Sequence, residues 1–436
     1  MTYDTPLYNL KAVINEGGLS PATLRAWERR YGLLKPGRTP GGHRLYSRQD
    51  IEMLKWLVER QNEGLSISRA VELWNHTAVD ARGSSAVPPT TLPTSEMGES
   101  KLDEMRQAWL AACMAFDDLA ANRILDQAFA LAAPELICIE VLQKGIALIG
   151  EGWYRGRVSV QQEHFATAIA SRRLNSLLAA TTPPTRPEPL LAACPPGEEH
   201  DFVLLLVSFL LRRGGWEVVY LGANVPLHEL DDTLRDVSPR LVISTAQMLT
   251  SAASLREMSG FVTSQGVAFA YGGGIFKHIP SLTRRISGHF LGNDIAAVPQ
   301  VVEQLVSRRE PVPTMEEVSP GYIHALEKFR QNDTMITNFV ASMTGEEAIK
   351  PAHLQIANEN LTRLITSALS LGEISYLDQS SGWLDGLLEN YALSPAFARQ
   401  YYATYRLAVD HYLGRDGEII HDWLTEQINA WHPEQG

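Results

Sequence analysis

The residues of this sequence best suited to chemistry lie between two apolar runs, where Glu198 precedes His200 by two positions. A neutral imidazole is a good ligand for a borderline metal ion, and a nearby carboxylate can fix its tautomer and raise its basicity. The pair therefore predicts a metal ligand with a supporting acid. Taken alone, a loop histidine of this kind is more often a solvent-exposed side chain. The elements around it must therefore show whether it lies where a ligand binds.

Those elements form a strand, a loop and a helix. Residues 190–193 predict a buried strand and residues 203–211 the helix after it, so His200 lies in the loop between them. The same alternation continues through residues 188–310 and predicts a parallel sheet with right-handed crossovers. The further predicted strands are 217–221, 241–244, 267–271 and, weakly, 290–291. Ligands bind at the carboxyl ends of such strands, where His200 is expected.

The order Glu198-x-His200 resembles the corrinoid-binding motif D/E-x-H-x-x-G, in which the histidine is the lower axial ligand of cobalt. This resemblance implies that His200 is the metal ligand and Glu198 its partner. Where the motif ends in glycine, this sequence has Val203. The positions that accommodate the buried nucleotide tail in similar cobalamin domains correspond to Ser244, Thr245, Gly272 and Gly273.

Residues 101–182 are rich in Ala and Leu at helical spacing and predict a four-helix bundle. The predicted breaks lie near 116–118, 133–134 and 150–152. Within the bundle, Trp153 is followed after nine residues by Glu163 and His164. This spacing resembles the helical cap of the CarH group of MerR-type cobalamin photoreceptors, which implies that these three residues line the pocket of the upper ligand. Where that group has a histidine after the tryptophan, Tyr154 stands here.

One strongly basic stretch lies near the N-terminus, with seven Lys or Arg between Arg25 and Arg48 against one acid, Glu28. Ser20-Pro21 predicts the start of a helix at residues 22–31, and an earlier amphipathic stretch makes this a helix-turn-helix. The sequence from Thr23 to Tyr46 resembles the DNA-binding domain of the MerR family. That resemblance implies a helix in the major groove and a hairpin wing on the DNA backbone. The implied groove contacts are Arg25, Arg29 and Arg30, and the implied backbone or minor-groove contacts are Arg38, His43, Arg44 and Tyr46.

The composition limits the classes of protein to which this chain can belong. The 436 residues are 45% hydrophobic and 20% charged, as in a soluble globular protein of several domains, and a net charge of −12 argues against one large nucleic-acid surface. The three cysteines are far apart with no C-x-x-C spacing, which predicts a reduced, cytoplasmic protein. No signal sequence is evident and no apolar run is long enough to span a bilayer, so we expect no membrane role.

We therefore expect a multidomain α and α/β fold. The expected parts are a winged helix-turn-helix at 1–80, a linker at 81–100, a four-helix bundle at 101–182, a flavodoxin-like (Rossmann-like) parallel sheet at 183–310 and an extra all-α C-terminal domain at 311–436. The last domain carries no motif, and its composition is acidic. Its tyrosines at near-helical spacing predict core rather than a ligand site: Tyr401, Tyr402, Tyr405 and Tyr412.

The sequence predicts a DNA-binding transcription regulator, a repressor, and not an enzyme, since no nucleophile–base pair or phosphate loop is evident. The resemblance implies that adenosylcobalamin controls DNA binding and that this control depends on light. A cofactor held between bundle and sheet would favour one homo-oligomeric state, a dimer or tetramer, and so multivalent binding to a DNA operator. One alternative is a MerR-like regulator that binds another tetrapyrrole such as a bilin, because Tyr154 and Val203 depart from the family pattern. Another is a corrinoid carrier for methyl transfer.

Overall fold

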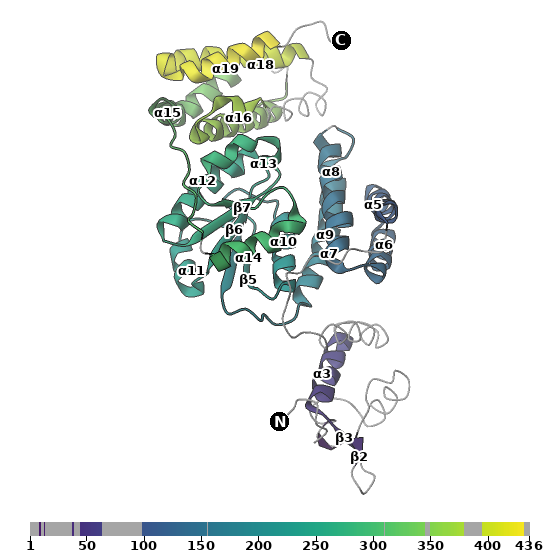
Figure 1. Cartoon of the computed structure of the whole chain (residues 1–436). Coiled ribbons are helices and arrows are strands. Elements are labelled where there is room, and N and C mark those ends of the chain that lie inside the picture. Colours follow the sequence, from purple (N-terminus) through teal and green to yellow (C-terminus); the bar gives the residue numbers. More distant parts are fainter. Residues whose placement is uncertain are drawn as a thin grey trace. The chain divides into compact units, whose positions relative to one another are not determined.

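The computed structural model of the 436-residue chain contains two compact units, Met1–Pro89 and Thr90–Gly436 (Figure 1). The structure describes residues 8–9, 13, 37–38, 44–62, 98–154, 156–308, 310–344, 349–378 and 395–430. Within these ranges, every helix is too short or too polar to cross a membrane.

The first unit contains a small antiparallel sheet followed by a helix. Its strands are β1 (Tyr8–Asn9), β2 (Gly37–Arg38) and β3 (Arg44–Tyr46), in the order β1-β3-β2. Helix α3 (Arg48–Asn62) begins after a reciprocal cap, in which Asp50 N–H donates to Ser47 Oγ at 3.1 Å and Ser47 N–H donates to Asp50 Oδ2 at 2.7 Å. The β2–β3 hairpin lies where the sequence predicts the wing, whereas the helix predicted at 22–31 falls outside the described residues.

A bundle of helices opens the second unit. Its elements are α5 (Glu99–Met114), α6 (Asp118–Leu131), α7 (Pro134–Ile137), the π-helical η1 (Cys138–Gln143), α8 (Lys144–Tyr154) and α9 (Val160–Ala179). Because α7, η1 and α8 follow one another without a break, these elements make the four helices that the sequence predicts.

The break predicted at residues 150–152 is wrong, because α8 continues through both glycines to Tyr154. Gly152 has a packing role instead of ending the helix. A Cβ atom at this position would lie 2.6 Å from Val158 Cγ2, so the glycine makes room for the chain that returns toward α9. A glycine in a helical pattern predicts a break, but here it allows a close approach of two chain segments.

A five-stranded parallel sheet follows, and all the predicted strands are confirmed. The strands are β4 (Pro189–Ala193), β5 (Glu217–Gly222), β6 (Leu241–Thr245), β7 (Ala268–Gly272) and β8 (His289–Phe290), in the order β5-β4-β6-β7-β8. The main helices are α10 (Phe202–Arg213), α11 (Leu230–Val237), α12 (Leu249–Ser264) and α14 (Val298–Arg308). Alternate β4 side chains enter two cores: Leu191 packs in the core that contains α11 and α12, and Leu190 in the core that contains α10 and α14.

Helix α10 packs against two partners at once. Phe202, Leu206 and Phe209 join the core of the bundle, whereas Leu204 and Leu211 join the core under the sheet. A helix that is apolar on all sides needs such a double burial, which explains the unbroken apolar run after His200. The bundle and the sheet therefore share α10, the helix that begins directly after the predicted metal ligand.

The C-terminal domain is helical. Its described elements are α15 (Pro320–Met343), α16 (Pro351–Leu371), η4 (Ile374–Leu377), α18 (Pro395–Leu413), η5 (Gly414–Gly417) and α19 (Glu418–Ala430). Tyr401, Tyr402 and Tyr405 are buried and Tyr412 packs against the same core, so the prediction that these rings form core is confirmed. This core is continuous with the α12 side of the sheet domain.

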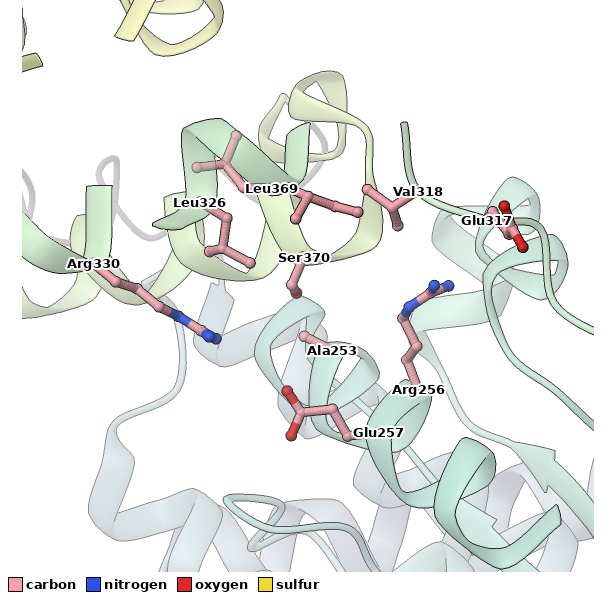
Figure 2. A pocket seen from close by; sticks show the side chains of 10 residues that line it. Ala253, Arg256, Glu257, Glu317, Val318, Leu326, Arg330, Leu369 and Ser370 are labelled. Carbon is pink, nitrogen blue, oxygen red and sulfur yellow. The ribbon is translucent and has the colours of Figure 1, made fainter. Parts of the chain in front are cut away.

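A cleft of about 380 Å³ lies between α12 and the C-terminal helices (Figure 2). The side chains labelled in Figure 2 include Arg256 and Glu257 of α12 and Leu326, Arg330 and Leu369 of the C-terminal domain. Arg256 crosses the boundary of the two domains, because its Nη1 donates to the carbonyl oxygens of Arg285 at 2.8 Å and Glu316 at 3.4 Å.

Candidate metal-ligand site

The centre of the site is a buried carboxylate that accepts four hydrogen bonds. Glu198 is 1% exposed. Its Oε1 lies 2.7 Å from His200 Nδ1 and accepts the backbone N–H of His200 at 2.9 Å. Its Oε2 accepts the backbone N–H of Gln247 and the hydroxyl of Ser251, both at 2.6 Å. Burial alone would raise the pKa of Glu198, but these hydrogen bonds outweigh it and hold the pKa below its ordinary 4.5.

His200 is held by this carboxylate and remains open to a ligand. Its side chain is 59% exposed, and the loop before α10 carries it at the carboxyl edge of the sheet, as predicted. Because Glu198 occupies Nδ1, Nε2 is the ring nitrogen that can bind a metal. The hydrogen bond that His200 donates to Glu198 raises the pKa of His200 above 6.5; burial opposes this rise, and the negative charges of Glu198, Glu163 and Glu199 add to it.

Two residues of this network, Ser251 and Gln247, are not predicted from the sequence. Ser251 lies in the first turn of α12 and Gln247 two residues before the helix, and both reach Glu198 because β4 and β6 are neighbours in the sheet. The signal available in the sequence was a Ser in the first turn of a predicted helix. It does not reveal a partner 53 positions earlier, because only the strand order brings the two together.

The loops at the carboxyl ends of the strands gather as expected. Cys194 N–H donates to Gly222 O at 2.9 Å, and Ala246 N–H donates to Gly272 O at 3.0 Å. Asn224 fastens the histidine loop at two points: its Oδ1 accepts Gly197 N–H at 2.8 Å and its Nδ2 donates to Glu199 Oε1 at 2.9 Å.

Gly273 shows how closely these loops pack. Its φ is +124°, and a Cβ there would lie 2.0 Å from the carbonyl oxygen of Ala246. Only glycine fits such an approach without strain. The loop after β7 therefore lies directly against the loop after β6.

The two hydroxyls predicted to meet a nucleotide tail lie inside the domain. Ser244 Oγ donates to Met258 Sδ at 3.8 Å, and Thr245 Oγ1 lies 3.7 Å from Cys194 Sγ. Both residues are buried. A ligand would therefore reach them only after side chains at the edge of β6 move.

The predicted cap residues occupy the ends of α8 and α9. Trp153 is 43% exposed. Glu163 Oε2 lies 2.5 Å from His164 Nδ1, and Glu163 Oε1 accepts the hydroxyl of Thr167 at 2.9 Å. His164 is 76% exposed. Glu163 contributes to the raised pKa of His200, so the bundle places its carboxylate within electrostatic reach of the histidine.

Most of the predicted DNA contacts lie beyond what the structure describes. Arg25, Arg29, Arg30 and His43 fall outside the described residues, and Arg38 and Arg44 are described only as a strand pair across the hairpin. The prediction that Tyr46 contacts DNA is wrong. It is 0% exposed and lies in the buried core of the unit with Ile51 and Leu54, because the central strand β3 turns this residue inward.

A parallel sheet that presents a carboxylate-supported histidine at its carboxyl edge, beside a helical bundle, defines the class of B12-binding domains. The MerR HTH family regulatory protein pattern matches residues 8–76, and two different B12 binding domain patterns match residues 105–178 and 189–301.

Two relatives that are transcriptional repressors match more than half of this chain. The HTH-type transcriptional repressor CarH of Myxococcus xanthus is 33% identical over 239 residues, which is 54% of this chain and 77% of that protein. The repressor CarA of the same organism is 32% identical over 236 residues, 53% of this chain and 74% of that protein. A solved monomethylamine corrinoid protein of Methanosarcina barkeri aligns with 47% of this chain and 99% of its own at 18% identity, with a TM-score of 0.40. The chain belongs to the family of MerR-type transcription regulators with B12-binding domains that includes CarH and CarA.

Proposed function

We propose that the chain is a transcription repressor that binds operator DNA when it holds adenosylcobalamin. In this proposal, light is the signal that ends DNA binding. The observation that carries this proposal is the Glu198–His200 pair, held by two further donors at the edge of the sheet. This pair supplies a nitrogen ligand suited to cobalt, in a chain that carries a MerR-type unit and is 33% identical to a transcriptional repressor.

The chain's own residues would orient and support the cofactor. Glu198 fixes the tautomer of His200, so that Nε2 would be the nitrogen that holds the cobalt, and its negative charge raises the basicity of the ring. Trp153, Glu163 and His164 at the end of the bundle would cover the opposite side. Bound adenosylcobalamin supplies a cobalt–carbon bond that light can cleave.

Control of assembly follows from the position of α10. This helix packs against both the bundle and the sheet, and it begins directly after the His200 loop. A cofactor held on that loop and covered by the bundle would favour one arrangement of the two parts. We propose that this arrangement exposes an oligomerisation surface, so that a dimer or tetramer binds DNA with several small domains at once.

A corrinoid carrier for methyl transfer is the second candidate. It is favoured by 26% identity over 123 residues to the methanol–corrinoid protein of Methanosarcina barkeri, which is 28% of this chain and 47% of that protein. The MerR pattern at residues 8–76 opposes it, since a carrier has no use for a DNA-binding unit. A regulator that binds a bilin instead would be recognised by the pigment that copurifies with it.

The test combines DNA binding with assembly state. Operator fragments are first selected from random duplexes, and binding and sedimentation are then measured with adenosylcobalamin in the dark and after green light. We expect oligomers and tight DNA binding in the dark, and loss of both after light. His200→Ala should bind weakly under both conditions. The matched control is His228→Ala, which removes an exposed histidine paired with Glu229 at 3.6 Å in the same domain. DNA binding that ignores the cofactor would refute the proposal.

A further inference from the structure

The cleft between α12 and the C-terminal helices is lined by two kinds of side chain (Figure 2). Its volume of about 380 Å³ is that of a site for a small organic molecule. One part of the lining is aliphatic, and the other part carries charged groups. A cleft of this composition suits a ligand that is itself partly apolar and partly charged.

The aliphatic part of the lining comes from both domains. Leu326 and Leu369 belong to the C-terminal domain, and Ala253 belongs to α12. Ile323, near the start of α15, lines the same cleft and is 46% exposed. Aliphatic side chains on the wall of a cleft gain free energy when an apolar group covers them. This wall therefore favours the apolar part of a ligand.

Arg256 differs from the other charged side chains of the lining, because it is partly buried and they are exposed. Its Nη1 donates to the carbonyl oxygens of Arg285 and Glu316, and these two bonds hold the guanidinium in place. Among the described residues, nothing accepts a hydrogen bond from its Nε or Nη2, and no carboxylate forms an ion pair with it. Two preorganised donors of a cation are therefore left for a ligand.

The electrostatic surroundings of Arg256 favour an anion. Burial lowers the pKa of this guanidinium below its ordinary value, and the positive charge of Arg285 lowers it further. Arg285 is compensated by Glu316, whose carboxylate lies 3.8 Å from its Nη1. A carboxylate bound to Arg256 would supply the missing negative charge, and a guanidinium can bind it through two parallel N–H···O bonds.

The exposed charges limit how negative the ligand can be. Glu257 and Glu317 line the cleft together with Arg330. With Arg256, the lining has two positive and two negative side chains, so its net charge is zero. The two carboxylates would repel a ligand with several negative charges, such as a nucleotide. A ligand with one negative charge avoids most of this repulsion.

We propose that the cleft is a second ligand site, which binds a small aliphatic monocarboxylate. Arg256 holds the carboxylate through Nε and Nη2, and the aliphatic chain lies on Ile323 and Leu326. The lining of this cleft shares no residue with the network around Glu198 and His200. The inference is therefore independent of the proposed cofactor.

Isothermal titration calorimetry of the full chain with octanoate tests the class of ligand. Two further probes separate its features: 1-octanol has the chain without the charge, and suberate adds a second carboxylate. We expect octanoate to bind about tenfold more tightly than 1-octanol, because the alcohol lacks the charge-assisted hydrogen bonds. Octanoate should also bind more tightly than suberate, because Glu257 and Glu317 repel the second charge.

Variants of the lining test the position of the site. Arg256→Gln should weaken octanoate binding about tenfold or more, while 1-octanol binding stays within about twofold. Arg256→Lys keeps the charge and should restore part of the affinity. Ile323→Asn should weaken binding of both probes about threefold, and its fold should be unchanged because this side chain is already exposed. The matched control is Arg363→Gln, at an exposed arginine of α16 outside the lining, which should bind as wild type.

Thermal unfolding of each variant without ligand checks its fold. A wild-type protein that does not bind octanoate, or that binds 1-octanol equally well, would overturn the proposal. Tighter binding of suberate would overturn the single charge of the ligand. Wild-type affinity in both Arg256→Gln and Ile323→Asn would show that octanoate binds elsewhere. Equal loss of octanoate and 1-octanol in Arg256→Gln would overturn the contact with the carboxylate.

Discussion

Glu198→Gln tests the supporting network at its centre. The carboxylate accepts two donors on each oxygen, whereas an amide accepts on one side only. If the amide oxygen faces His200, Ser251 can rotate and accept from the NH2 group, but the N–H of Gln247 then meets hydrogens. A buried donor left unpaired costs about 1–3 kcal/mol, and weaker bonds to an uncharged acceptor add about 1 kcal/mol. We expect the free energy of unfolding to fall by about 2–4 kcal/mol.

The pH dependence of this effect has a defined window. The pKa of Glu198 is held below 4.5, so its contribution is present above pH 4.5 and is lost as pH falls through the folded pKa. The pKa of His200 is raised above 6.5, so its contribution is complete below pH 6.5 and is lost as pH rises through the folded pKa. The difference between wild type and Glu198→Gln should therefore be greatest between pH 4.5 and 6.5.

Cofactor binding should respond as well. Loss of a partner that orients a metal-binding histidine lowers metal affinity by about 10–100-fold. The pKa of His200 should fall in the variant, because its largest cause, the Glu198 hydrogen bond, loses its charge. Protons would then compete with the metal only at lower pH.

Urea unfolding of the unloaded protein measures the first effect, and a spectrophotometric cobalamin titration across pH measures the second. Glu188→Gln, an exposed residue before β4, is the matched control and should behave as wild type. A Glu198→Gln protein with wild-type stability and wild-type affinity throughout this pH range would refute the role given to the carboxylate.

Three further predictions address other parts of the molecule. Trp153→Ala should weaken adenosylcobalamin binding about tenfold or more while the melting temperature of the unloaded protein stays unchanged, because this aromatic is already 43% exposed. Gly273→Ala should lower the melting temperature sharply, since its Cβ would lie 2.0 Å from Ala246 O, whereas Gly272→Ala meets open space and should melt as wild type. Arg38→Ala should reduce the slope of log K against log salt for duplex DNA by about 0.9, and an unchanged slope would remove this residue from the phosphate contacts.

The parts of the fold that sequence reasoning predicted are those with local causes. Strands buried on both faces read as continuous apolar runs, which is why β4 and β6 are found within a residue of their predicted bounds. The position of His200 followed from the same runs. The resemblance to known motifs then added a role for this histidine that periodicity alone does not give.

The features that the sequence does not predict depend on residues that are far apart in the chain and neighbours in the fold. Ser251 meets Glu198 because β4 lies beside β6, and no local pattern encodes that pairing. The sequence predicts a helix break at Gly152 because the contact that requires this glycine, Val158, lies beyond the helix. The sequence predicts that Tyr46 contacts DNA because the alternation of side chains on so short a strand does not show that β3 is central.

The central claim is that His200 binds the cobalt of a bound cobalamin. Electron paramagnetic resonance of the reduced, cobalt(II) form tests it most directly, with protein whose histidines carry the heavy nitrogen isotope and cofactor with natural nitrogen. If His200 is the axial ligand, the nitrogen splitting should change its number of lines on labelling, and His200→Ala should lose the effect. A splitting that ignores the label would show that the cofactor's own base remains bound, and would contradict the account.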